Sequence, residues 1–80
     1  MSEQALLSLF SRILGELLGD PSIQLRKETT RADVPDWDSF NYVNFIVAVE
    51  MELGIRFSVA DVESFETVGD IVTEARALLA

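Results

Sequence analysis

The chain has 80 residues, 49% of them hydrophobic, with no cysteine, no histidine and a formal net charge of −8 at pH 7. This length permits one small domain with a single core, and the acidic balance argues against nucleic-acid binding, which requires basic patches. Without cysteine or histidine the chain lacks the usual nucleophiles, general bases and soft metal ligands, so its composition argues against an enzyme and against a metal site.

The first predicted element is an amphipathic helix that starts near Ser2 or Glu3 and stops near Gly19-Asp20-Pro21. Its apolar residues recur at three- and four-residue spacing: Leu6, Leu7, Phe10, Ile13, Leu14, Leu17 and Leu18. The N-terminus lacks the basic start of a secretory signal, and no apolar run reaches membrane-spanning length. We therefore expect a cytoplasmic protein without membrane insertion.

Residues 20–38 form an unusually long connection for so small a domain, and long connections are often functional. Its apolar residues predict a packed segment rather than a loose one: Ile23, Leu25, Val34 and Trp37. The acids Asp33, Asp36 and Asp38 do not have the spacing of a calcium-binding loop, and the required glycine is missing.

Residues 39–53 predict a second helix that ends at Gly54 and has two apolar faces. One face carries Phe40, Val43, Val47 and Met51. The opposite face carries Tyr42, Phe45, Ile46, Val49 and Leu53. Because a helix of a small bundle usually buries a single stripe, one face belongs to the core and the other must pack against something else.

Two short polar patterns predict the remaining helices. Ser58 with Asp61 begins a short third helix, and Thr67 with Asp70 begins the last one. The alternation at residues 55–57 could form a strand, but no nearby segment offers a partner. The predicted fold is all-α, a four-helix bundle with a long first loop and a short third helix.

Ser39 stands where the long connection meets the second predicted helix. Backbone N–H groups at a helix start lack intrahelical acceptors, and the helix dipole favours negative charge there. A phosphate ester on this hydroxyl would be well placed. Residues 32–80 hold ten acids against Arg56 and Arg76, which favours partners with basic docking surfaces.

The chain resembles the acyl carrier proteins from about Leu6 to Leu78. The resemblance rests on Asp38-Ser39-Phe40, Val43, Glu50-Met51-Glu52-Leu53-Gly54-Ile55 and Thr67-Val68-Gly69-Asp70-Ile71. The family's attachment motif is Asp-Ser-Leu, with Phe40 here in the last position. The resemblance implies one carrier domain over residues 1–80, freestanding, monomeric and not an enzyme.

The resemblance also implies the chemistry. In this family the serine hydroxyl, here Ser39, is joined by a phosphodiester to 4′-phosphopantetheine from coenzyme A, whose thiol holds acyl groups as thioesters. Asp38 would be the motif acid and helix cap. A phosphopantetheinyl transferase would load the arm, and synthetases, ketosynthases or acyltransferases would use it. Fatty-acid-like, polyketide and other specialised lipid biosynthesis are the implied pathways.

The two faces of the second helix gain roles from the same resemblance. Core residues between which an acyl chain can slip would be Tyr42, Phe45, Ile46, Val49, Leu53, Phe57, Phe65 and Ile71. Partner enzymes would dock on Phe40, Val43, Asn44, Val47 and Met51. Asn41, Asn44 and Met51 stand where acids are typical of the family, although Glu50 and Glu52 are kept. We therefore expect a more apolar docking face with dedicated partners.

Other interpretations of the residues stay open. A D-alanyl or other aminoacyl carrier also uses Asp-Ser before a long helix, whereas the Gly-Gly-x-Ser typical of peptidyl carriers is absent. An unmodified helical interaction module, using the second apolar face as a dimer interface, belongs to a different class. Modification of Ser39 discriminates between a carrier and such a module.

Overall fold

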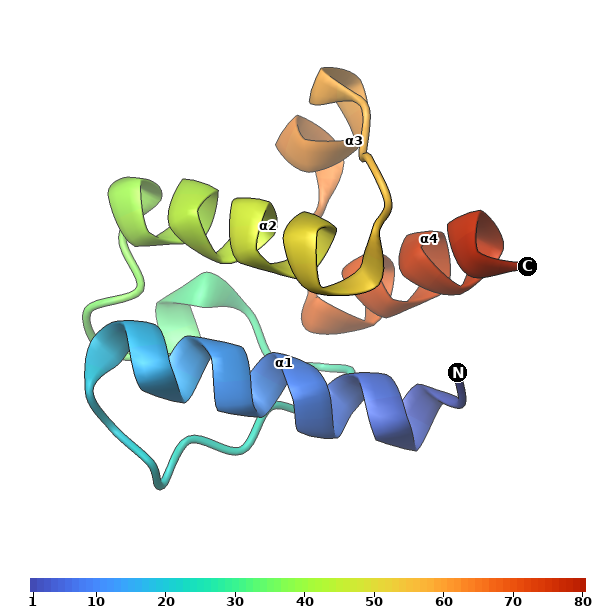
Figure 1. Ribbon diagram of the computed structural model, residues 1–80. Helices are drawn as coiled ribbons and strands as arrows, with labels where there is room; N and C mark the ends of the chain where they lie inside the picture. The colour runs from blue at the N-terminus through green and yellow to red at the C-terminus, as the bar shows by residue number, and fades with distance from the viewer.

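The computed structural model describes residues 1–80 and has four α-helices and no strand (Figure 1). The helices are α1 (Glu3–Leu18), α2 (Ser39–Leu53), α3 (Val59–Ser64) and α4 (Val68–Leu79). In Figure 1, α1 and α2 run in opposite directions one above the other, and α4 lies beyond them near the chain termini. The predicted all-α architecture and the predicted bounds of the helices are confirmed, and residues 55–57 form no strand.

Side-chain caps fix where the helices begin. The Ser2 hydroxyl accepts a hydrogen bond from the Ala5 N–H at 3.1 Å, and the Ser58 hydroxyl accepts one from the Asp61 N–H at 3.0 Å. Each bond satisfies a backbone donor that the helix itself leaves free. The first two long helices end at glycines in the left-handed region, Gly19 with φ 69° and Gly54 with φ 67°. Side chains rarely tolerate that conformation, so glycine is the expected residue at both ends.

The core lies between α1, α2 and α4 and is almost entirely aliphatic and aromatic. Phe45 of α2 is at its centre, with its ring edge-to-face on Phe10 at 5.6 Å and on Trp37 at 5.2 Å between ring centroids. No polar or charged residue is buried in this cluster. The face of α2 with Phe45, Ile46 and Val49 is therefore the core face, as the family resemblance implies.

The connection between α1 and α2 is packed, and it contains a short 3-10 helix at Arg31–Asp33 that the sequence pattern did not predict. The Ser11 hydroxyl accepts a hydrogen bond from the Leu25 N–H at 2.8 Å. Near the start of α4, the Lys27 carbonyl accepts one from the Gly69 N–H at 2.9 Å. A Cβ at Gly69 would lie 2.9 Å from that carbonyl oxygen, so only glycine permits this approach. These bonds fix the connection across α1 and α4.

Helix α3 is held more weakly than the other helices, because none of its six residues is buried. It is attached by a hydrogen bond that the Tyr42 hydroxyl donates to the Val62 carbonyl at 2.7 Å and by the partly buried Val62 side chain. Phe57 and Phe65, on either side of the helix, are in edge-to-face contact at 5.4 Å. Short length and little apolar burial are typical of elements that open first. No helix of the chain has the length and apolar character needed to cross a membrane.

The start of α4 depends on a carboxylate, which gives a prediction about pH. Asp70 accepts hydrogen bonds from the backbone N–H groups of Glu66 at 2.9 Å and Thr67 at 3.2 Å, and these bonds hold the pKa of its carboxyl below the ordinary value. Because this pKa is lowered in the folded protein, the ionised Asp70 carboxylate stabilises the fold at pH values above its unfolded-state pKa. This stabilisation disappears as the pH falls through the folded-state pKa.

We expect Asp70→Asn to lower the thermal midpoint by a few degrees at neutral pH. The difference should close as the pH is lowered from about 3.9, the ordinary aspartate pKa, through the lowered pKa of Asp70. Thermal melts of both proteins from pH 7 to pH 2 measure it. Asp61→Asn, which removes a carboxylate that makes no hydrogen bond, is the control. A deficit that is the same at every pH would refute the role of the Asp70 charge.

Candidate functional site: the start of helix α2

Ser39 is the first residue of α2, and it is exposed to solvent. Its hydroxyl makes no hydrogen bond within the protein, and neither do the backbone N–H groups of Ser39 and Phe40. The first turn of α2 holds no acidic residue. A free hydroxyl thus stands beside free N–H donors at the positive end of the helix dipole, an arrangement that suits a covalently attached phosphate.

Asp38 and Asn41 hold this helix start in place. One carboxylate oxygen of Asp38 accepts a hydrogen bond from the Asn41 N–H at 2.9 Å, so the predicted cap is present. The Asn41 side-chain amide donates to the Asp36 carbonyl at 2.9 Å. Asp36 has φ 69°, a left-handed conformation that is uncommon outside glycine and that aspartate and asparagine tolerate best. Asn41 therefore secures the bend before Ser39 with an N–H donor that an aspartate at this position would lack.

The face of α2 that points away from the core is exposed and apolar. Phe40 is 74% exposed and Met51 80%, with Val43 and Val47 between them at 55% and 46%. Asn44 lies on the same side and is partly buried. The structure thus brings together all five residues of the predicted docking face, next to Ser39, in one surface.

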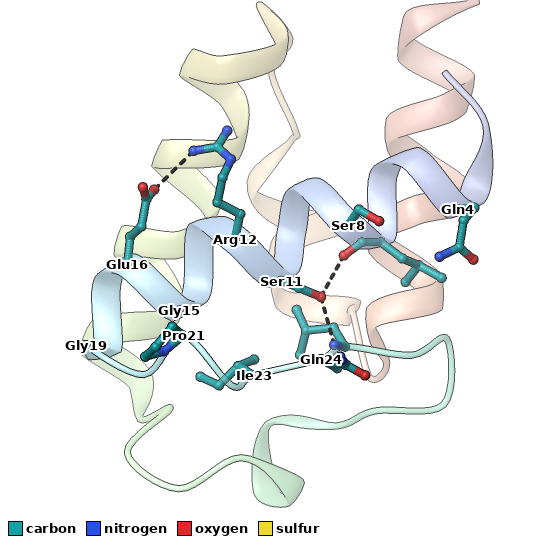
Figure 2. A pocket seen from close by; sticks show the side chains of 12 residues that line it. Gln4, Ser8, Ser11, Arg12, Gly15, Glu16, Gly19, Pro21, Ile23 and Gln24 are labelled. Atoms are coloured by element: carbon teal, nitrogen blue, oxygen red, sulfur yellow. Dashed lines mark hydrogen bonds and ion pairs between the residues drawn. The ribbon is translucent and has the colours of Figure 1, made fainter.

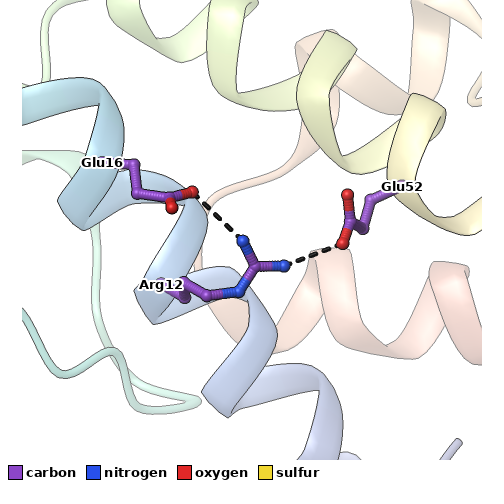
Figure 3. Close-up of polar contacts among 3 residues, drawn as sticks. All are labelled: Arg12, Glu16 and Glu52. Atoms are coloured by element: carbon purple, nitrogen blue, oxygen red, sulfur yellow. Dashed lines mark hydrogen bonds and ion pairs between the residues drawn. The ribbon is translucent and has the colours of Figure 1, made fainter.

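Both acids of α2 make contacts within the domain that sequence reasoning missed. One carboxylate oxygen of Glu50 accepts a hydrogen bond from the Phe57 N–H at 2.8 Å. Glu52 pairs with Arg12 of α1 at 2.8 Å, and Arg12 also pairs with Glu16 at 3.1 Å (Figure 3). Both carboxylates of α2 thus contact groups of the domain itself, and the outer face formed by Phe40, Val43, Val47 and Met51 carries no acid.

The opposite face of α2 forms the predicted interior. Phe45 and Val49 are fully buried, and Ile46, Phe57 and Ile71 are buried with them. Tyr42, Leu53 and Phe65 are partly buried and pack against this cluster. Burial raises the pKa of the Tyr42 hydroxyl, an effect that the nearby charge of Arg31 partly offsets. All eight predicted interior residues are therefore brought together.

Two features near this interior had no distinct sequence signal. The Arg31 guanidinium lies over the Tyr42 ring, 4.9 Å from its centroid, in a cation–π contact. Trp37 is buried in the core, and its indole N–H has no hydrogen-bond acceptor. Its apolar character was evident from the sequence, but the unpaired donor depends on where the neighbouring acceptors fall in space.

A surface groove of about 770 Å³ lies between α1 and the connection that follows it (Figure 2). Ser11, inside this groove, donates to the Leu7 carbonyl at 2.7 Å and accepts from Leu25, so its hydroxyl is occupied. None of the predicted site residues lines this groove. It is an open surface groove separate from the start of α2.

Comparison with known proteins gives one consistent result. A family model described as "Phosphopantetheine attachment site" matches residues 4–74. Two proteins named acyl carrier protein are similar over 90% of this chain. The one from Acidothermus cellulolyticus is 32% identical over 86% of its own length, and the one from Thermotoga maritima is 33% identical over 89%.

A solved structure agrees with these matches. The solution NMR structure of holo acyl carrier protein from Geobacter metallireducens superimposes with a TM-score of 0.84 and 30% identity, over 91% of this chain and 84% of that one. Both the sequence and the arrangement of helices are thus shared with carriers. The chain belongs to the acyl carrier protein family, whose members bear a covalently attached phosphopantetheine and act as carriers rather than enzymes.

Proposed function

We infer that Ser39 is the residue to which 4′-phosphopantetheine is attached, and that residues 1–80 act as a single carrier domain. The observation that carries this assignment is the exposed, unbonded Ser39 hydroxyl on the first turn of α2, beside two free backbone N–H groups. These donors and the helix dipole favour the negative charge of a phosphodiester. When bound, the group supplies a terminal thiol that holds acyl groups as thioesters.

Asp38 and Asn41 act as positioning residues in this proposal. The Asp38 cap keeps the first turn of α2 formed, and Asn41 fixes the preceding bend through the Asp36 carbonyl. Both contacts hold the backbone that presents Ser39 to a phosphopantetheinyl transferase. A preformed helix start lowers the ordering cost when the transferase binds.

The direct test is transfer of the arm from coenzyme A by a broad-specificity phosphopantetheinyl transferase. Intact mass would show the gain of one arm, and mapping of the modified peptide would place it on Ser39. A modification on another residue would contradict the assignment, and no modification by several transferases would favour an unmodified interaction module.

The docking face favours dedicated partners in fatty-acid-like, polyketide or other specialised lipid biosynthesis. Phe40, Val43, Val47 and Met51 present an exposed apolar strip, and Glu50 and Glu52 are held within the domain. Exposed apolar strips of this kind bind partners through complementary apolar surface, while a basic rim on the partner can meet the acidic loops. An acyl-processing enzyme with an apolar docking patch is the partner that fits.

Met51→Glu tests this partner preference. Restoring an acid at the most exposed position of the strip should raise use of the carrier by a general fatty-acid ketosynthase, by up to about fivefold for one exposed charge pair. Steady-state rates at limiting carrier concentration measure the change. Leu78→Glu, an exposed apolar residue on α4, should have no such effect. Equal use of wild type and Met51→Glu would refute a specialised docking face.

A further inference from the structure

The indole N–H of Trp37 is a buried donor without an acceptor. Trp37 is only 4% exposed, and its Nε1 is the one buried side-chain polar atom of the chain that lacks a hydrogen-bond partner. Leaving a buried donor unpaired is costly, and native proteins seldom do so without a reason such as a ligand or an ordered water. The core face of this carrier thus contains one polar position that the protein itself leaves unsatisfied.

The polar side chains around the neighbouring cavity do not accept a hydrogen bond from Trp37. Trp37 lines a cavity of about 10 Å³ together with Tyr42, Phe65, Ile71, two threonines and the charged residues Arg31 and Glu66. The Tyr42 hydroxyl donates to the Val62 carbonyl at 2.7 Å, and the Thr67 hydroxyl accepts from the Asp70 N–H at 3.2 Å. The Thr29 hydroxyl likewise accepts from the Arg26 N–H at 2.9 Å. None of these hydroxyls accepts a hydrogen bond from Trp37, so its indole N–H remains available to an acceptor from outside the protein.

The cavity adjoins the part of the fold that is easiest to open. Its volume is near the lower limit for one water molecule, so a larger guest needs a wall to move. Helix α3 has no buried residue and is tied to α2 through the Tyr42–Val62 hydrogen bond. Phe65, directly after α3, lines the cavity and contacts Phe57 edge-to-face. Displacement of α3 would enlarge the space beside Trp37 while α1, α2 and α4 stay packed.

We propose that the Trp37 indole N–H donates a hydrogen bond to an oxo or hydroxyl oxygen of the acyl cargo, so that this carrier accommodates oxygenated acyl chains better than saturated ones. Trp37 precedes Ser39 by two residues and packs against Tyr42 and Phe45 in the first two turns of α2, so it lies at the end of the interior nearest Ser39. The rest of the interior is apolar and suits the hydrocarbon tail. This inference rests on the proposed attachment at Ser39.

The sole tryptophan makes the test direct, because the chain has one indole N–H signal in a ¹H–¹⁵N spectrum. The transferase would load octanoyl or 3-hydroxyoctanoyl arms from the corresponding coenzyme A thioesters, and intact mass would confirm each product first. We expect the indole proton to move downfield and to exchange more slowly with solvent in the 3-hydroxyoctanoyl form than in the octanoyl form. The same position and exchange rate in both forms would overturn the proposal, including the case in which a buried water satisfies Trp37.

A pair of variants provides a second, independent readout. The thermal midpoint of the 3-hydroxyoctanoyl form should exceed that of the octanoyl form in wild type and in Phe65→Leu, which changes the cavity wall and keeps the indole. Trp37→Phe should abolish the difference; if it does not fold, the spectra of wild type decide. A difference that persists in Trp37→Phe would refute the indole donor. Failure of loading would contradict attachment at Ser39 instead, so the two inferences fail separately.

Discussion

Replacement of Ser39 by alanine is expected to abolish phosphopantetheine transfer completely while leaving the fold intact. The loss should be total because alanine has no oxygen to form the phosphodiester. The fold should persist because the Ser39 side chain is exposed and makes no hydrogen bond, and because Asp38 rather than Ser39 caps α2. Alanine is also favourable in a first helical turn. The variant therefore tests loss of the attachment site without a change in the stability of the fold.

Intact mass after incubation with coenzyme A and transferase measures the result, and a thermal melt checks the fold. Ser64→Ala is the matched control, since Ser64 is another exposed serine on a helix and should be irrelevant to loading. An arm added to Ser39→Ala, or lost from Ser64→Ala, would contradict the assignment. The same samples also decide between a carrier and an unmodified module.

The helices and their starts could be predicted because their signals are local. The spacing of apolar residues defines α1 and α2. Ser58 with Asp61 and Thr67 with Asp70 are three residues apart, the spacing at which a capping hydroxyl accepts a hydrogen bond from a backbone N–H. The division of α2 into two faces also follows from helix periodicity, and burial agrees with it. The family resemblance then decided which face belongs to the interior, and the comparisons confirm the family.

What could not be predicted depends on contacts between distant segments. Arg12 and Glu52 are 40 residues apart, so no sequence pattern indicates that this acid is paired. Glu50 accepts a hydrogen bond from the Phe57 N–H across the turn after α2, and the Asn41 side-chain amide donates one to the Asp36 carbonyl. Each role depends on a bend in the chain rather than on residue type. The lack of a hydrogen-bond acceptor for the Trp37 indole N–H likewise depends on the tertiary structure.

Phe45→Ala is expected to destabilise the domain far more than truncation of any exposed side chain. Phe45 is fully buried and joins α1 to the connection through edge-to-face contacts with Phe10 and Trp37. Truncating a buried phenylalanine costs about 3–5 kcal/mol from lost transfer energy and the cavity left behind. A domain of this size has a total stability of roughly 4–12 kcal/mol, so the variant should lose a large share of it. The thermal midpoint should fall by roughly 15 °C or more.

Phe40→Ala is the matched control, because it removes the same side chain from the same helix at a site that is 74% exposed. Its free energy of unfolding should change by less than about 0.5 kcal/mol, as is usual for exposed positions. Urea denaturation of the two variants measures both values. If Phe40→Ala destabilised the domain as much as Phe45→Ala, the outer face of α2 would have to be packed within the protein, and it would then not be free to dock. A large cost at Phe45 with almost none at Phe40 is the energetic signature of a helix with one face in the core and the other left for a partner.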